Sequence, residues 1–112
     1  MLKKQNRLKN KNDFDKVFKK GISVFGQILG IKFSKNTSMF NRFGVIVSKK
    51  ISKKAIERNK IKKQIKDILR NEEKNLKKGN DFVIITLPEI KNKKYKEIQL
   101  EISKNFKKIN AY

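Results

Sequence analysis

A short apolar strand followed at once by a strongly basic helix constrains the fold of this chain more than any other feature. The run Gly44-Val45-Ile46-Val47 has the composition of a buried strand, and apolar residues recur at helical spacing after residue 54. Between Lys49 and Lys66 there are nine basic residues and one acid, Glu57. Like charges on neighbouring helical turns repel, so this density does not come from stability. It needs an external polyanion to offset it, and we expect that polyanion to be RNA.

The overall charge extends this expectation from one helix to the whole chain. A length of 112 residues suits one domain. The formal net charge is +21, from 31 Lys and Arg against 10 Asp and Glu, and such a field attracts nucleic acid. Codon bias towards Lys explains Lys in place of Arg but not the shortage of acids. We predict a single RNA-binding domain over residues 1–112, in which residues 1–11 are a basic segment that could be flexible.

The residue types that are missing exclude several kinds of site. There is no Cys and no His, which removes disulfide scaffolds, zinc sites with Cys or His ligands, and triads built on histidine. A two-metal nuclease site needs carboxylates that converge from separate elements, whereas the close acidic pairs are Asp13/Asp15 and Glu72/Glu73. We therefore expect no catalytic residue and no metal site in this chain.

The sequence also bears on location. No apolar run approaches the ~20 residues of a membrane span. The basic N-terminus has no hydrophobic segment after it, so it does not have the pattern of a secretory signal. We expect a cytoplasmic bacterial protein with no membrane contact.

The spacing of apolar residues predicts the order of the elements. We expect helices over 12–20, 54–71 and 93–108, and strands over 27–34, 43–48 and 82–87, with 22–25 as an additional short strand. The buried stripe of the basic helix would be Ile61, Ile65, Ile68 and Leu69. The result is an α+β sandwich in the order α-β-β-(β)-α-β-α, with a central three- to four-stranded sheet packed by helices on one face.

Two motifs in this order resemble the protein subunit of bacterial ribonuclease P. Residues 43–51 are FGVIVSKKI, and residues 55–63 are AIERNKIKK. The family has a Val-Ser-Lys-Lys strand end, then an Arg-Asn-Arg helix start followed by Lys-Arg. The opening is similar too, with Arg7-Leu8-Lys9 before Asp13-Phe14 and Val17-Phe18. The resemblance covers nearly the whole chain.

The chain departs from the family pattern at three places. Lys60 and Lys63 stand where the family usually has Arg, which keeps the charge but loses the planar fork that grips phosphate. The connection Ser52-Lys53-Lys54 lacks the usual glycine and is one residue longer. Lys32 stands where an aromatic residue is common on the substrate-facing side, so a phosphate contact would replace a stacking contact there.

The resemblance implies a fold and a function. The basic helix would join two parallel strands in a left-handed sense, although about 98% of such crossovers are right-handed. The catalyst would be an RNA that removes the 5′ leader from precursor tRNA using Mg²⁺, and the protein itself would need no cofactor. Its partners would be the ribonuclease P RNA and the precursor tRNA leader, held between the first helix, the basic helix and the sheet. The protein would act as a monomer within the holoenzyme.

The candidate binding residues form two sets. The set expected to bind the catalytic RNA is Lys49, Lys50, Arg58, Asn59, Lys60, Lys62, Lys63 and Lys66. The set expected to bind the leader is Phe14, Phe18, Lys32, Ser48 and Lys49. Helical spacing further predicts that Arg58, Lys62 and Lys66 present one charged ridge.

Several alternatives stay open at this point. Phe14 and Phe18 could be core residues of a short helix instead of surfaces for unpaired bases. Asn59 could cap the basic helix, and Ser48-Lys49-Lys50 could be an ordinary exposed strand end. The whole chain could be a ribosomal or general RNA-binding protein. A free-standing nuclease is the alternative from a different class, opposed by the missing His and the scattered acids.

Overall fold

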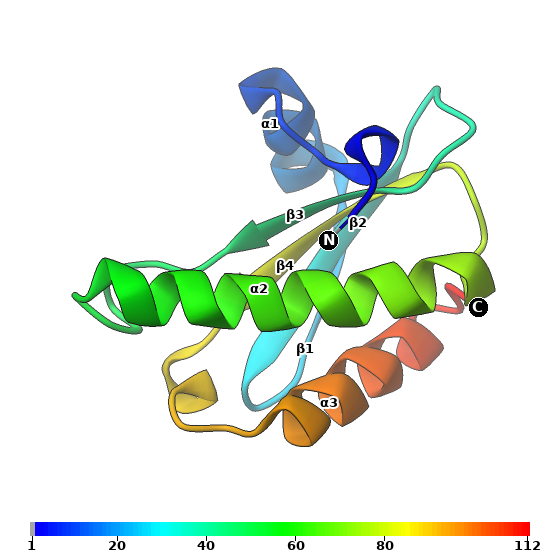
Figure 1. Ribbon diagram of the computed structural model, residues 1–112. Helices are drawn as coiled ribbons and strands as arrows, with labels where there is room; N and C mark the ends of the chain where they lie inside the picture. Colours follow the sequence, from blue (N-terminus) through cyan, green and yellow to red (C-terminus); the bar gives the residue numbers. More distant parts are fainter. Residues whose placement is uncertain (1) are drawn as a thin grey trace.

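A computed structural model describes residues 2–112 as a four-stranded sheet with helices on both faces (Figure 1). The main elements are α1 (Lys11–Lys20), β1 (Ile22–Phe25), β2 (Leu29–Lys35), β3 (Arg42–Ile46), α2 (Ala55–Glu72), β4 (Asn80–Thr86) and α3 (Tyr95–Lys108). Three short 3₁₀ turns complete the chain: η1 (Lys4–Asn6), η2 (Glu73–Asn75) and η3 (Pro88–Ile90). The predicted α+β order is confirmed, and the short strand at 22–25 is present.

The sheet contains one pair of parallel strands. The strand order is β1-β2-β4-β3, in which β2 is antiparallel to β1 and β4, and β3 is parallel to β4. The helix α2 connects β3 to β4. In Figure 1, α2 lies in front of the sheet, both strands point to the left and β4 lies below β3, so this connection is left-handed. It therefore has the uncommon sense that the family resemblance implied.

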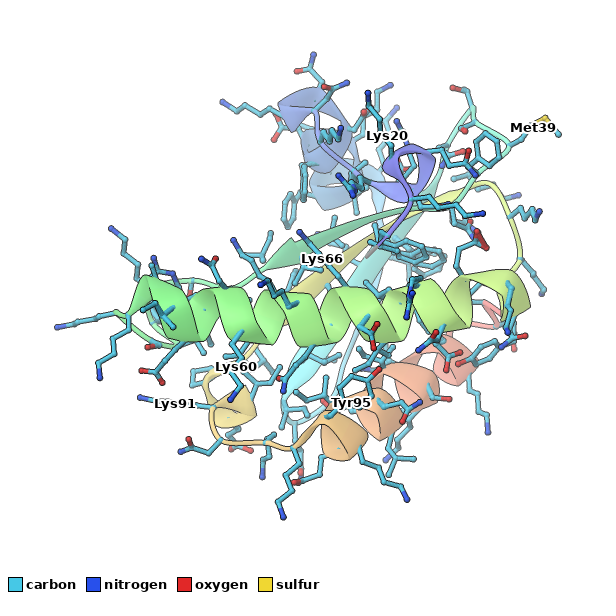
Figure 2. The ribbon with its side chains drawn as sticks, in the orientation of Figure 1. Lys20, Met39, Lys60, Lys66, Lys91 and Tyr95 are labelled. Carbon is cyan, nitrogen blue, oxygen red and sulfur yellow. The ribbon has the colours of Figure 1, made fainter. Side chains whose placement is uncertain are left out.

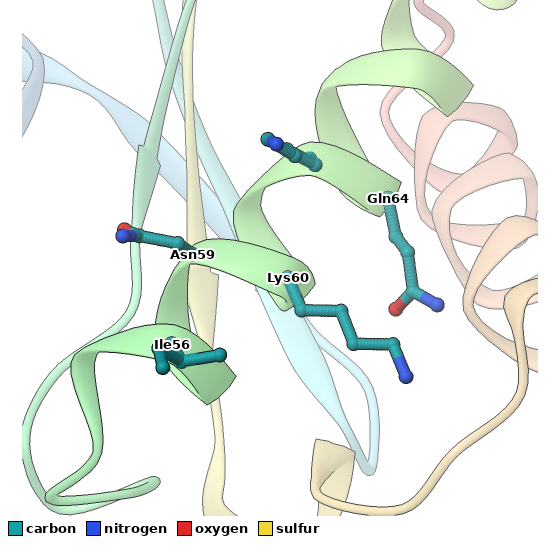
Figure 3. Close-up of a pocket in the computed structure, with 5 residues that line it drawn as sticks. Ile56, Asn59, Lys60 and Gln64 are labelled. Atoms are coloured by element: carbon teal, nitrogen blue, oxygen red, sulfur yellow. The ribbon is translucent and has the colours of Figure 1, made fainter.

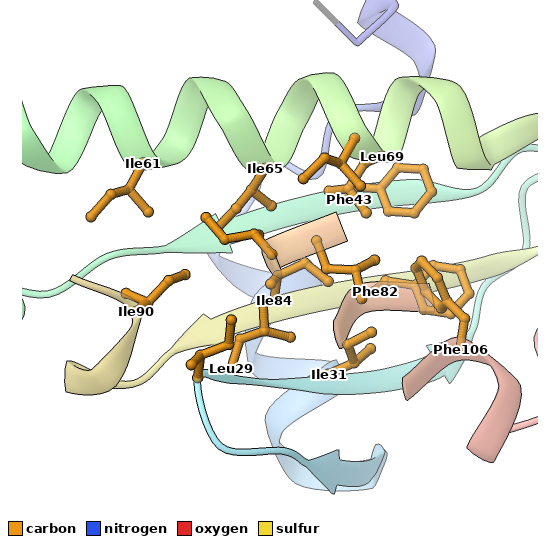
Figure 4. Close-up of a cluster of buried hydrophobic side chains, with 14 of the residues drawn as sticks. Leu29, Ile31, Phe43, Ile61, Ile65, Leu69, Phe82, Ile84, Ile90 and Phe106 are labelled. Carbon is orange, nitrogen blue, oxygen red and sulfur yellow. The ribbon is translucent and has the colours of Figure 1, made fainter. Parts of the chain in front are cut away.

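The main core lies between the sheet and the helices α2 and α3 (Figure 4). The predicted stripe of α2 is buried in full, namely Ile61, Ile65, Ile68 and Leu69. The centre of this core is Phe82 of β4, whose ring centroid lies 5.4 Å from that of Phe43 and 5.3 Å from that of Phe106. This aromatic cluster ties the parallel strands to α3.

The prediction that helices cover only one face of the sheet is wrong. The helix α1 packs on the face opposite α2 and α3, where Val17 and Val83 form a second, smaller core with Leu8. The reason lies in β4, whose alternate residues are buried on both sides of the sheet: Phe82 points to the main core and Val83 to α1. A continuous apolar run is typical of a strand covered on both faces.

All three helix starts differ from the predicted ones by one or two residues, and α3 begins at Tyr95 instead of residue 93. The first helix begins at Lys11 and has Asn10 at its N-cap, so Asn12 lies inside it. The helix α2 begins at Ala55, and Asn59 lies within it, so the alternative that Asn59 caps this helix is wrong.

The segment before α1 packs against the sheet. Leu2 and Leu8 are buried, at 3% and 6% exposure. The Leu8 amide donates a hydrogen bond of 2.9 Å to the Phe43 carbonyl, and Asn6 Nδ2 donates one of 2.7 Å to the Asn41 carbonyl. These contacts fix the entry into α1 and therefore the position of that helix.

Candidate nucleic-acid interface

A row of apolar side chains crosses the sheet on the face that carries α1. Strand pairing places Phe25 opposite Gly30, Gly30 opposite Ile85, and Ile85 opposite Ile46. Paired residues share one face of a sheet. A Cβ at Gly30 would overlap the ring of Phe25, so this ring lies directly over the glycine. Phe25 is nevertheless 50% exposed, and Ile46 and Ile85 are only partly buried.

The helix α1 borders this row with two aromatic residues. Val17 is fully buried against the sheet, while Phe14 is partly buried and Phe18 is 40% exposed. The ring of Phe14 lies over Gly44, where a Cβ would overlap it. Lys32 Nζ lies 5.6 Å from the ring centroid of Phe18, a cation–π contact. We call the surface formed by Phe14, Phe18, Phe25, Lys32, Ile46 and Ile85 the open face.

The structure thus brings together three of the predicted leader-binding residues, Phe14, Phe18 and Lys32. The two phenylalanines differ in burial. Phe14 packs against the small core beside Val17, so the core alternative holds for it in part. Phe18 is not among the residues of that core, and its ring is available at the surface.

Sequence reasoning missed Phe25 as a member of this surface. The alternation of β1 puts Phe25 and Ser23 on one face but does not say which face of the sheet that is. The decisive information is the pairing with Gly30, since only a residue without a side chain leaves space for the ring. An aromatic residue paired with a glycine in an adjacent strand is the signal that could have found it.

Arg42 holds α1 in place beside the open face. Its Nε and Nη2 donate hydrogen bonds of 2.8 and 2.7 Å to the two carboxylate oxygens of Asp81 in β4, and Nη1 faces Asp13 of α1. The Asp81 side chain is 6% exposed. Its hydrogen bond raises the pKa of Arg42 above the ordinary value, and the charge of Asp13 acts in the same direction. A charge-assisted, bidentate pair of this kind fixes geometry as well as adding energy.

The basic residues of α2 point to two sides of the helix. Asn59, Lys62 and Lys66 share one concave surface with Lys63, while Lys60 and Gln64 face the connection between β4 and α3. Figure 2 shows Lys66 on the β3 side of α2 and Lys60 on the opposite side. Figure 3 shows a shallow pocket on α2 that joins the two sides, with Asn59 at one edge and Lys60 and Gln64 at the other.

Arg58 does not form a common ridge with Lys62 and Lys66, so that prediction is wrong. Its Nη1 donates hydrogen bonds of 3.0 Å to the carbonyls of both Ser52 and Lys53, which turns the guanidinium back towards the connection before α2. Arg58 therefore braces the connection that departs from the family pattern.

A second contact supports the same connection. The Ser52 hydroxyl lies 3.2 Å from Glu57 Oε1, to which it donates, and it accepts a hydrogen bond from the Lys54 amide. The segment Ser48-Lys49-Lys50 is exposed and forms a turn, because β3 already ends at Ile46 and the Ile51 amide bonds to the Ser48 carbonyl. Its two lysines thus stand at the corner between β3 and α2.

One residue of the predicted acidic pairs makes a structural contact at the C-terminal end of α2. Glu72 accepts a hydrogen bond of 2.8 Å from the Tyr112 hydroxyl, and burial raises the pKa of Tyr112 to about 12. Across residues 2–112, no three metal-ligating side chains come together as a cluster. In the same part of the chain, no helix combines the length and apolarity that crossing a membrane requires.

Comparison with known proteins decides the family. The family model described as Ribonuclease P matches residues 2–110. The chain belongs to the ribonuclease P protein family. A relative from Clostridium botulinum strain Langeland, named ribonuclease P protein component, is 36% identical over 110 residues, which cover 97% of this chain and 98% of the relative. A protein of the same name from Pseudanabaena is 39% identical over 100 residues, covering 88% and 85% of the two chains.

Solved structures agree with this assignment. The ribonuclease P protein of Staphylococcus aureus superposes with a TM-score of 0.88 at 27% identity, over 96% of this chain and 97% of that one. Membership of the family connects the protein to tRNA processing and implies an RNA partner in the holoenzyme.

Proposed function

We propose that this chain binds both the catalytic RNA of ribonuclease P and the 5′ leader of precursor tRNA, as a monomer within a cytoplasmic holoenzyme. In this proposal the RNA subunit cleaves the leader and uses Mg²⁺, and the protein supplies no catalytic group. The protein supports the reaction in two ways, by tethering the leader and by screening the repulsion between the two RNAs.

The open face is the observation that carries the leader-binding part. Unpaired bases stack on aromatic side chains, and phosphates are drawn to nearby cations. Phe18 and Phe25 are both exposed by 40% or more. Lys32 lies beside the Phe18 ring and pairs with Ser23, two residues before Phe25 in β1. Exposed aromatic rings that lie together form an apolar surface in contact with water. Such a surface typically marks an interaction site, and a stacked base would cover it.

The remaining leader contacts would come from the corner after β3. Ser48 and Lys49 are exposed there, two and three residues beyond Ile46 of the open face. A single strand that leaves the aromatic rings along β3 reaches this corner next. Backbone phosphate contacts would set its position without reading its sequence.

Contact with the catalytic RNA is assigned to the corner and to α2. The residues are Lys49, Lys50, Arg58, Asn59, Lys60, Lys62, Lys63 and Lys66. Arg58 has a double role here, because it also braces the connection before α2. Each lysine that neutralises a phosphate releases counterions, so assembly should weaken steeply with salt.

The test is cleavage of a leader-bearing precursor tRNA by a bacterial ribonuclease P RNA at low Mg²⁺, with and without this protein. We expect a protein-dependent gain in cleavage that an unrelated protein of equal charge does not give. No gain with the cognate RNA and folded protein would favour a ribosomal or general RNA-binding protein. Cleavage by the protein and Mg²⁺ alone would instead favour a free-standing nuclease.

A further inference from the structure

A groove lies on the side of α2 that faces away from β3, between this helix and the connection from β4 to α3. It is lined by Lys60 and Gln64 of α2 and by Lys91, Asn92 and Lys93 of the connection. Figure 2 shows Lys60 and Lys91 close to η3 on this side of the helix. Lys91 and Lys93 belong to neither set of candidate residues found from the sequence.

The connection is a defined turn that presents its lysines in a fixed place. Ile90 is buried at 1% exposure and anchors η3 in the main core. The Lys91 amide bonds to the Pro88 carbonyl at 3.2 Å, and the Lys93 amide bonds to the Ile90 carbonyl at 3.0 Å. Asn92 has φ of 70°, in the left-handed region that asparagine tolerates better than most residues. The backbone therefore holds Lys91 and Lys93 at the mouth of the groove.

The charge of the groove is not balanced from within. Its three ammonium groups, on Lys60, Lys91 and Lys93, face one acid, Glu57, whose Oε1 already accepts from the Ser52 hydroxyl. Gln64 and Asn92 add amide groups that can donate hydrogen bonds. No aromatic residue lines the groove. Cations and amides without aromatic rings suit a phosphodiester backbone and not stacked bases.

The groove and the open face lie on different sides of the sheet. The open face is on the α1 side of the sheet, whereas α2 covers the other side. We propose that the groove binds a backbone segment of the catalytic RNA, so that α2 separates the catalytic RNA from the precursor leader. The inference rests on the proposed function and adds to it a second RNA surface, centred on Lys91 and Lys93.

The first test compares two double variants with the same loss of charge. The test variant is Lys91→Gln/Lys93→Gln, and the matched control is Lys77→Gln/Lys78→Gln, whose side chains are exposed beyond η2. We expect the test variant to bind the catalytic RNA about tenfold more weakly near physiological salt, and the slope of log K against log salt to flatten by about 2. The control should change both quantities much less. Equal losses in the two variants would overturn the proposal, because they would show attraction by net charge alone.

The second test locates the RNA. The chain has no Cys, so a single Lys91→Cys variant can carry a tethered iron–EDTA cleavage reagent without further changes. In the assembled holoenzyme with precursor tRNA, we expect discrete cuts in the catalytic RNA and none in the leader. Cuts in the leader, or no localised cuts in the catalytic RNA, would overturn the proposal.

The two proposals can fail separately. If the wild-type protein raises cleavage at low Mg²⁺ while the Lys91/Lys93 variant assembles like its control, the groove assignment is wrong and the proposed function stands. If the wild-type protein gives no such gain, the proposed function fails first.

Discussion

Arg42 of β3 donates a hydrogen bond of 3.2 Å from Nη1 to Oδ2 of Asp13 in α1. Within residues 2–112 it is the one ion pair that joins α1 to the sheet. Both side chains are partly buried, at 26% and 18% exposure, and Arg42 is itself held by Asp81. Because α1 carries Phe14 and Phe18, this ion pair acts with the small core around Val17 to position the two rings on the open face.

The Asp13→Asn variant should therefore weaken leader recognition without unfolding the protein. Arg42 keeps its bidentate contact with Asp81, and a partly exposed ion pair contributes about 1 kcal/mol or less. We expect the preference of the holoenzyme for precursor over mature tRNA to fall by up to about fivefold, the equivalent of about 1 kcal/mol. The ratio of the two dissociation constants measures the effect.

Asp15→Asn is the matched control for this prediction. Asp15 lies on the same helix, is exposed, and takes part in none of the ion pairs of the described residues. The Asp15→Asn substitution removes the same negative charge as Asp13→Asn, so any general gain in RNA affinity is the same in both variants. If the two variants show equal tRNA preference, the ion pair does not position α1 for binding.

The two aromatic residues of α1 should respond differently to truncation. Phe18→Ala removes an exposed ring, and stacking of one base on an aromatic side chain contributes about 1–3 kcal/mol. We expect roughly tenfold weaker binding of precursor tRNA, with little change in Tm and in assembly with the catalytic RNA. Phe14→Ala should also lower Tm, because this ring packs in the small core beside Val17. Equal losses of precursor binding and assembly in Phe18→Ala would mean that the ring is only structural.

Charge reversal on α2 should act on assembly instead. Lys62 lies on the β3 side of α2, in a concave surface whose one acidic residue is Asp67. The Lys62→Glu variant therefore adds a negative charge to a mostly basic surface. We expect assembly with the catalytic RNA to weaken strongly and to recover partly at lower salt. Lys107→Glu, on the exposed last turn of α3, makes the same change of charge and serves as the control. A folded Lys62→Glu variant that assembles like this control would place the RNA elsewhere.

The sequence predicted best the elements whose buried residues follow directly from the spacing of apolar residues. The four buried residues of α2 follow from helical spacing alone, and they were identified correctly. Spacing alone does not show which other element packs beside each side of a helix or strand. Helical periodicity separates Lys60 from Lys62, but only the packing of α2 beside η3 shows that Lys60 and Lys91 line one groove. Phe25 escaped notice for the same reason, since its role depends on its partner Gly30.

The position of Arg58 illustrates a different limit. Its spacing from Lys62 is that of neighbours on a helix surface, and the prediction of a shared ridge used that spacing correctly. A long side chain near a helix start, however, can bend back to carbonyl groups that precede the helix. The carbonyls of Ser52 and Lys53 are such acceptors, and the connection that offers them departs from the family pattern.

Asn105 offers a test of the core that is independent of RNA. It is fully buried on α3, and neither its Nδ2 nor its Oδ1 has a hydrogen-bond partner in the described chain. An unsatisfied buried polar group costs about 1–3 kcal/mol, and an apolar side chain of similar size avoids that cost. We therefore expect Asn105→Leu to raise the free energy of unfolding by about 1 kcal/mol or more, measured by urea denaturation. Asn105→Ala separates the contributions, because it removes the same amide but leaves a cavity and should gain less. A Leu variant less stable than the wild-type protein would contradict this prediction.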